Sequence, residues 1–349
     1  MTVPEEPEWR SWKQIDWAHA GSPIGISDGV WPEVTWGKNN NQQAGPTGEP
    51  WVNSNGWLIR YARSRAGKRE VWLKSDPPEK PETLEENAFR FAVIEAAAFG
   101  AVRPAWVPDD QNAPGRLRAI GADLQWLNTH PEWAQWDVPA QLVVISSFSG
   151  DEADFAGEVL NLSARLDLPV DVLGQKSLSI YRAALWLDSE ADVAALRAFV
   201  QGGGLLICKH NALGGRLKPA LHPRYDLFEL GKGRVAVAKK EWDDPFVLAA
   251  DAHLLLSRRW DDVRLFNASA IQFRFALRED GRRAVVQLLN YTLREAASPI
   301  TLQLRRPARA ARWHLLGQAD AKALTLQQAG REWPLPPFPL YAAVELEYA

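Results

Sequence analysis

Residues 193–208 read VAALRAFVQGGGLLIC, and this run decides the class of fold. Leu196, Phe199 and Val200 recur at helical spacing on one face, three glycines follow, and four apolar residues then fit a buried strand. The glycines end the helix, because a phosphate-binding loop would follow a strand and open a helix instead. The run therefore predicts an amphipathic helix that leads into a strand of a parallel sheet.

The same alternation of strand and helix extends on both sides of this run. The expected strands are Gln141–Ser146, Pro169–Leu173, Ala183–Leu187, Leu205–Cys208 and Gly233–Ala238. The expected helices are Asp151–Leu166, Ser189–Gln201 and Asp244–Trp260. We therefore predict a doubly wound parallel sheet over residues 139–268.

The pattern changes to period two after this region. Ile271, Phe273 and Phe275 alternate with polar residues, and Glu279-Asp280-Gly281 is typical of a hairpin turn. Further short strand patterns follow to the end of the chain. Residues 269–349 therefore predict an antiparallel β-sandwich.

The first part of the chain, residues 1–138, is rich in Trp, Pro, Asn and Gly. Strand patterns occur at Glu70–Lys74 and Val102–Val107, and helix patterns at Thr83–Phe99 and Arg116–Asn128. Eight strand–helix units need about 250 residues, so a complete barrel does not fit. The sequence predicts a partial or atypical (β/α) module here, and an α/β class for the chain as a whole.

The composition limits the classes of partner and cofactor. A net charge of −3 over 349 residues, without a large basic patch, predicts no nucleic acid partner. One cysteine and six scattered histidines predict no metal site, and nothing indicates a cofactor. No apolar run is long enough to span a membrane, so no membrane partner is expected. The acidic, proline-rich start predicts a cytoplasmic chain, unless an export signal is missing from the frame upstream.

Tryptophan is in excess, with 17 residues, most of them before residue 137. Such a surplus indicates flat, ring-shaped ligands or a thick aromatic core. Trp51, Asn53, Asn55 and Trp57 would together offer a stacking surface and amide groups for sugar hydroxyls. The alternative is that both tryptophans fill the core while the asparagines form turns.

Three runs resemble multidomain glycoside hydrolases related to β-galactosidases: EAAAFGA at Glu95–Ala101, LRAFVQGGGLL at Leu196–Leu206 and VQLLNYT at Val286–Thr292. The resemblance implies a (β/α) barrel region, a flavodoxin-like, glutamine-amidotransferase-like trimerisation domain and a C-terminal β-sandwich. It also implies a carbohydrate partner and a homo-oligomer. The catalytic glutamates of these relatives lie on strands that this sequence lacks, so neither is carried over. The amidotransferase-like domain is non-catalytic in these families, and Cys208 lies within a strand rather than on a nucleophile elbow.

Glycoside hydrolysis requires two carboxylates across a cleft. The candidate acids are Asp28, Glu33, Glu49, Asp76 and Glu95. Asp76 directly follows a strand, where barrel enzymes place functional side chains, although it could instead cap a turn. Glu95 lies in an apolar helix, where burial would raise its pKa toward that of a general acid. A buried ion pair with Arg90 or Arg103 is the alternative.

The expected substrate-binding residues are aromatic, amide or basic side chains: Trp31, Trp51, Asn53, Asn55, Trp57, Trp72, Arg103 and Trp106. With the acids, they predict a Trp-lined cleft within residues 28–106 that hydrolyses or binds a glycoside. Two alternatives stay open. The chain could be a non-catalytic carbohydrate-binding or oligomerisation subunit, or a truncated fragment of a longer glycoside hydrolase.

Overall fold

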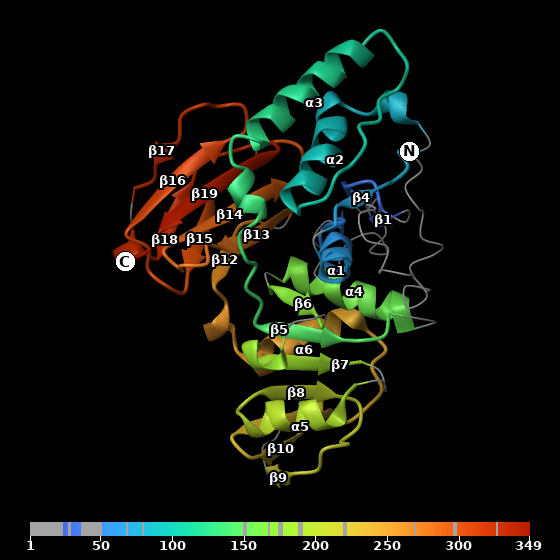
Figure 1. Ribbon diagram of the computed structural model, residues 1–349, viewed down its shortest axis with the longest axis vertical. Coiled ribbons are helices and arrows are strands. Elements are labelled where there is room, and N and C mark those ends of the chain that lie inside the picture. Colours follow the sequence, from blue (N-terminus) through green and yellow to red (C-terminus); the bar gives the residue numbers. More distant parts are fainter. Residues whose placement is uncertain are drawn as a thin grey trace.

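The computed structural model describes residues 24–26, 29–35, 51–67, 69–78, 80–148, 152–166, 168–173, 177–187, 191–218, 222–268, 270–295, 299–325 and 327–349. Figure 1 shows them in three parts: N-terminal strands and helices at the top right, C-terminal sheets at the left, and an α/β layer below. The chain thus has mixed α and β content, several sheets and a β-rich C-terminal region, as the sequence predicts.

The N-terminal part is a short series of parallel strands joined by helices. β1 (Ile24–Ile26) pairs in parallel with β4 (Val71–Leu73), and Val102 extends this pair through a parallel bridge to Trp72. The helices of this part are α1 (Gly56–Ala66), α2 (Glu86–Ala98) and α3 (Ala113–Leu127). A small antiparallel hairpin of β2 (Glu33–Thr35) and β3 (Trp51–Asn53) precedes α1.

The middle part is a seven-stranded sheet in the order β6-β5-β7-β8-β11-β10-β9. Its strands are β5 (Leu142–Ile145), β6 (Val170–Val172), β7 (Ala183–Trp186), β8 (Leu205–Cys208), β9 (Arg216–Lys218), β10 (Tyr225–Leu230) and β11 (Gly233–Ala238). Its helices are α4 (Glu152–Arg165), α5 (Val193–Gln201) and α6 (Pro245–Leu256). The first five strands are parallel and follow the order 2-1-3-4-5 of flavodoxin-like folds.

The last two strands of this sheet differ from the predicted all-parallel arrangement. β10 and β11 pair as an antiparallel hairpin in which Leu230 lies opposite Gly233. Gly231, at the turn, has a φ of 62°, a left-handed conformation that glycine adopts without a steric penalty. The chain therefore reverses within two residues, and β10 and β9 extend the sheet in the antiparallel sense.

The helix and glycine run of residues 193–208 packs closely against the neighbouring strands. The side chain of Asp192 caps α5 by accepting hydrogen bonds from the backbone N–H of Ala194 and Ala195, at 2.9 and 3.1 Å. A Cβ on Gly233 would lie 2.1 Å from the carbonyl oxygen of Val200 and 2.3 Å from that of Gly204. The sheet can approach the end of α5 only because no side chain stands between them.

The C-terminal part consists of two antiparallel sheets around a shared apolar core, which includes the buried indoles of Trp313 and Trp333. One sheet holds β12 (Val263–Phe266), β15 (Ile300–Leu304) and β18 (Glu332–Leu335). The other holds β13 (Ile271–Leu277), β14 (Arg283–Asn290), β19 (Tyr341–Glu347), β16 (Ala310–Leu315) and β17 (Lys322–Ala323). Since β12 pairs with β15, these sheets begin ahead of residue 269, the boundary predicted from the sequence.

The outer face of β13 is not exposed to solvent. Gln272 and Arg274 are only 4% and 6% exposed, because this face of the sheet packs against the N-terminal part, with Phe91 and Ile94 of α2 in the shared core. The guanidinium of Arg274 donates to the carbonyl oxygen of Trp133 at 3.0 Å and to the amide oxygen of Gln287 at 2.8 Å. The C-terminal sheet thus forms part of the support for the N-terminal helices.

The close approach at Gly233 can be tested with two glycine substitutions. Gly233→Ala should lower the free energy of unfolding by about 2 kcal/mol or more, because its Cβ would overlap two backbone oxygens. Gly121→Ala, within α3 and with no atom within 4 Å of the added Cβ, should raise it by about 0.5–1 kcal/mol. Chemical unfolding followed by circular dichroism measures both. Equal stability of the two variants would contradict the packing described for Gly233.

Candidate functional site

The carboxyl ends of β1, β4 and the bridging residue Val102 meet at one edge of the N-terminal part, because the three segments run in parallel. Gly29, after β1, donates its N–H to the carbonyl oxygen of Lys74 at 3.1 Å. A Cβ on Gly29 would lie 2.6 Å from this oxygen, so glycine permits the approach. The segments that leave this edge carry Trp31, Ser75, Asp76, Arg103 and Trp106. In (β/α) barrels, the corresponding edge carries the functional side chains.

Arg103 is the buried cation of this edge, with a side chain only 7% exposed. Its guanidinium lies 4.8 Å from the ring centroid of Trp31 and donates to the backbone carbonyl of Ser75 at 3.3 Å. Burial lowers the pKa of Arg103 to about 10, although the nearby charge of Glu95 acts in the opposite direction. The second guanidinium nitrogen, Nη1, and the hydroxyl of Ser75 are buried without a hydrogen-bond partner among the described residues.

An aromatic row runs from the interior to the surface beside Arg103. The rings of Trp31 and Phe89 lie 5.9 Å apart, and those of Phe89 and Trp106 lie 6.2 Å apart. Trp31 is buried, whereas Trp106 is 42% exposed and presents its indole to solvent. Asp76, just after β4, is also exposed. This edge therefore offers an aromatic surface, a carboxylate and a nearby cation, which together suit a polyhydroxylated ring.

Glu95 lies behind this edge and is completely buried. Its carboxylate accepts three hydrogen bonds: from the backbone N–H of Asn55 at 2.8 Å, from the side-chain amide of Asn55 at 2.7 Å and from the hydroxyl of Tyr291 at 2.7 Å. Burial raises the pKa of Glu95, while these bonds and the charge of Arg103 oppose the rise. With no exposed surface, this carboxylate positions its neighbours and does not reach a glycosidic oxygen.

The expected arginine partners of Glu95 are arranged differently. Arg90 donates two hydrogen bonds to the carboxylate of Asp123 instead, at 2.7 and 2.9 Å. Arg103 acts on Glu95 through its charge. The direct partners, Asn55 and Tyr291, are neutral donors, so the burial of Glu95 depends on hydrogen bonds and not on an ion pair.

The two asparagines of the suggested sugar-binding cluster are engaged within the protein. The side-chain amide of Asn55 donates to Glu95 and to the carbonyl oxygen of Val30, and its oxygen accepts from the N–H of Val30 at 2.8 Å. Asn53 lies opposite Glu33 in the β2–β3 hairpin and donates to its exposed carboxylate at 3.4 Å. Asn55 therefore fixes the backbone ahead of Trp31, while Asn53 and Glu33 lie on a small hairpin.

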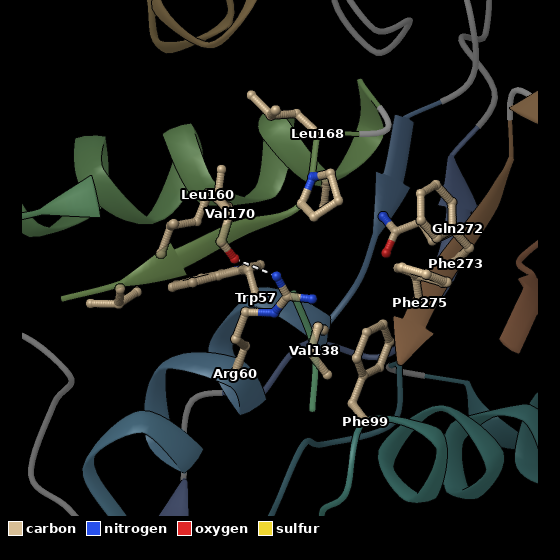
Figure 2. A pocket seen from close by; sticks show the side chains of 14 residues that line it. Trp57, Arg60, Phe99, Val138, Leu160, Leu168, Val170, Gln272, Phe273 and Phe275 are labelled. Atoms are coloured by element: carbon tan, nitrogen blue, oxygen red, sulfur yellow. Dashed lines mark hydrogen bonds between the residues drawn. The ribbon is translucent and has the colours of Figure 1, made fainter. Parts of the chain in front are cut away.

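Trp57 belongs to a different region, between α1 and the middle part. A Cβ on Gly157 of α4 would lie 2.9 Å from the indole of Trp57. Figure 2 shows Trp57 beside Leu160 and Val170, in a largely apolar pocket where Arg60 donates to the carbonyl oxygen of Val170. The cavity in this pocket is about 40 Å³, which is room for a few waters and not for a sugar ring.

The remaining predicted residues are placed as follows. Trp72 is half-buried on β4, and its indole N–H donates to the carboxylate of Glu70 at 3.2 Å. Asp28, Glu49 and the side chain of Trp51 lie outside the described residues. The structure thus brings Trp31, Asp76, Arg103 and Trp106 to one edge, and it places Glu95, Asn55 and Trp57 elsewhere.

Sequence reasoning missed the residues that join the three parts around Glu95. Tyr291 donates to Glu95, the amide of Gln272 donates to the hydroxyl of Ser54 at 3.1 Å, and that hydroxyl donates to Asn161 of α4 at 3.4 Å. One signal in the sequence could have identified Tyr291: it is a polar residue at the end of an apolar strand, in the run Val286–Thr292. A buried hydroxyl at such a position requires a hydrogen-bond partner.

Other kinds of site find little support in the described part of the chain. No group of three or more His, Cys, Asp or Glu side chains there could hold a metal ion. Nor does any helix within the described ranges have the length and apolarity to cross a membrane. Burial raises the pKa of the Cys208 thiol to about 12, so this cysteine has no thiolate character near neutral pH.

Comparison with solved structures relates this geometry to glycoside hydrolases. No family model and no curated protein matches the sequence. The fold is similar to that of a GH42 β-galactosidase from G. stearothermophilus, with a TM-score of 0.57, 13% identity, and coverage of 97% of this chain and 60% of that one. It is also similar to α-L-fucosidase isoenzyme 2 from Paenibacillus thiaminolyticus, with a TM-score of 0.57, 13% identity, and coverage of 84% and 62%.

A rhamnosidase from Novosphingobium sp. PP1Y is a further structural neighbour, with a TM-score of 0.59, 14% identity, and coverage of 94% of this chain and 37% of that one. The chain therefore shares a fold with glycoside hydrolases related to β-galactosidases, as the resemblance of the sequence runs implies. It spans less than two thirds of the length of each of these neighbours.

The hydrogen bonds around Glu95 make a prediction about stability. Glu95→Gln should lower the free energy of unfolding by about 1–3 kcal/mol, because the new NH₂ group would face a donor of Asn55 or Tyr291. The matched control is Glu82→Gln, an exposed residue that should change stability by less than about 0.5 kcal/mol. Urea unfolding compares the two variants with the wild type. Equal effects would mean that the buried carboxylate is not stabilised by its donors.

The raised pKa of Glu95 predicts a pH dependence with a definite sign. The folded state holds a proton on Glu95 more tightly than the unfolded chain does, so the contribution of this group to stability is greatest below its ordinary pKa. That contribution is lost as the pH rises through the raised pKa. The stability difference between the wild type and Glu95→Gln should therefore be larger near pH 5 than near pH 8. A smaller difference near pH 5 would contradict the direction of the shift.

Proposed function

We propose that this chain is a carbohydrate-active protein of the glycoside hydrolase type, which takes a glycoside at the carboxyl edge of β1, β4 and Val102. The observation that supports this most is that the exposed indole of Trp106 and the exposed carboxylate of Asp76 lie on segments that leave the same edge, which carries functional residues in related folds. The similarity to β-galactosidase, fucosidase and rhamnosidase structures favours a sugar as the ligand.

Each residue of the edge has a distinct role in this proposal. Trp106 provides the face on which the apolar side of a sugar ring stacks. Arg103, buried between Trp31 and the carbonyl of Ser75, supports this edge from behind and contributes its positive charge there. Asp76 transfers the proton to the leaving-group oxygen, and the second carboxylate comes from Glu33, Asp28 or Glu49.

A second candidate is a non-catalytic carbohydrate-binding subunit that assembles through its flavodoxin-like middle part. The burial of Glu95 favours it, because one of the expected carboxylates is then unable to act on a substrate. Under this alternative the edge still binds sugar through Trp106, with the charge of Arg103 behind it, while the protein forms a homo-oligomer. The mass of the purified protein in solution tests the assembly directly.

The two candidates predict different results with aryl glycosides of galactose, fucose and rhamnose. If the chain is an enzyme, it should hydrolyse at least one of them, and Asp76→Asn should reduce the rate by about 100-fold or more while binding persists. Trp106→Ala should weaken binding of the same sugar. If the chain is a binding subunit, no aryl glycoside is hydrolysed and Trp106→Ala alone abolishes saturable binding.

Asp226→Asn provides the matched control, since Asp226 is an exposed carboxylate on β10, in the middle part. This change should leave both hydrolysis and binding within about twofold of the wild type. If the chain neither hydrolyses nor saturably binds any of the three sugars, the proposal is overturned in both forms.

A further inference from the structure

A much larger cavity lies in the middle part, on the side of the sheet where β7, β8 and β11 begin. Its volume is about 940 Å³, and its walls come from the 3-10 helix Leu178–Ile180, the end of α5 with its three glycines, and the 3-10 helix Arg258–Trp260. β7 and β8 start at the left of Figure 1 and point to the right, and the residues that line the cavity lie at the starts of these strands. This edge is opposite to the carboxyl ends at which open α/β sheets usually bind ligands.

Among the residues that the structure describes, the charged ones that line this cavity are all basic. They are Arg182, Lys232, Arg234 and Arg259. Within the described ranges, none of these four side chains forms a salt bridge with a carboxylate. The whole chain carries a net charge of −3, so four cations around one cavity are a local concentration against the overall sign. Arg234 also lies opposite Glu229 of β10, whose carboxylate accepts from Lys218 at 2.8 Å.

Trp260 holds two of these cations in place. The guanidinium of Arg182 lies 3.4 Å from the centroid of the Trp260 ring, and that of Arg259 lies 4.9 Å from it. A guanidinium stacked on an indole uses its face for this contact, so its in-plane N–H groups are left to bind oxygen atoms. Arg305 also lies near this ring, at 5.8 Å, but its Nε donates to the carboxylate of Asp262 at 2.9 Å.

All four basic side chains are exposed to solvent, and their shared charge favours an anion in this cavity. Burial and the charges of Arg305 and Arg259 lower the pKa of Arg182, while the charge of Asp262 acts in the opposite direction. The carboxylate of Asp262 is already shared between Arg305 and the side-chain amide of Gln141, which donates at 3.0 Å. The hydroxyls of Ser177 and Ser179, 2.9 Å apart on another wall, add neutral hydrogen-bonding groups.

We propose that this cavity binds a soluble ligand that carries two or more oxyanion groups: carboxylate, sulfate or phosphate. One anionic group lies between Arg182 and Arg259 and the other lies near Lys232 and Arg234. The volume falls within the range of small-ligand sites and is large enough for a short anionic oligomer. An acidic oligosaccharide and a polyphosphate share this chemistry. The inference does not depend on the glycoside site, which lies in another part of the chain.

Isothermal titration of the full chain tests the proposal with three probes: trigalacturonate, inorganic tripolyphosphate and an uncharged galactotriose. We expect saturable binding of at least one of the two anions, weakened by added salt. Binding of trigalacturonate alone identifies the ligand as an acidic sugar, and binding of tripolyphosphate alone identifies it as a phosphate compound. No binding of either anion at low ionic strength, or binding of galactotriose as tight as that of trigalacturonate, would overturn the proposal.

Paired substitutions locate the site. Arg182→Gln with Arg259→Gln should weaken binding of the anion by about tenfold or more, because two charge-assisted contacts are lost. Arg118→Gln with Arg331→Gln removes the same charge from exposed positions outside the cavity and should leave the affinity within about twofold. Equal weakening by the two pairs would show attraction to the overall charge only and would refute the site.

A second pair keeps the test valid if loss of the contacts with Trp260 disturbs the fold. Lys232→Gln with Arg234→Gln alters the opposite wall and leaves the stacked guanidiniums intact. This pair should also weaken binding of the anion by about tenfold or more. Asp76→Asn should leave anion binding unchanged, so failure of this site and failure of the glycoside site give different results.

Discussion

A fully buried carboxylate, that of Glu95, is the constraint on which the arrangement of this protein depends. A charged group without hydration is tolerated only where donors replace the lost water. The donors come from Asn55, at the start of α1, and from Tyr291, which is 196 residues away along the chain. The bonds from Gln272 to Ser54 and from Ser54 to Asn161 extend the same network to α4. One set of hydrogen bonds therefore joins all three parts.

This network also determines the geometry of the candidate site. Asn55 holds the backbone of Val30 on both its N–H and its carbonyl sides, which fixes the approach of Trp31 to Arg103. The charge of Arg103 in turn partly offsets the burial of Glu95. The edge that presents Trp106 and Asp76 thus depends on contacts made well behind it. The carboxylate of Glu95, which the sequence suggested as a general acid, therefore supports the site and does not act on a substrate.

Two cavities outside this edge, the pocket around Trp57 and the basic cavity of the middle part, differ in chemical character. The pocket around Trp57 is small and mostly apolar, as expected where three packed parts meet. The cavity at the starts of β7, β8 and β11 is large, and the described charged residues that line it are all basic. A neutral polyol and a multiply charged anion would therefore bind at separate places, one to an indole and a carboxylate and the other to guanidinium and ammonium groups.

The sequence by itself determined the strand–helix alternation of the middle part, because apolar periodicity and glycine placement are local properties of residues such as Phe199 and Gly204. It also indicated the C-terminal strands β13, β14, β15, β16 and β19, but not β12 or β18, and the aromatic and acidic residues that leave β4 and Val102. Only the tertiary structure decided that Gln272 and Arg274 are buried and that Glu95 bonds to Tyr291. Such pairs join residues far apart in the chain, and a periodic pattern shows which faces of an element differ without showing what covers them.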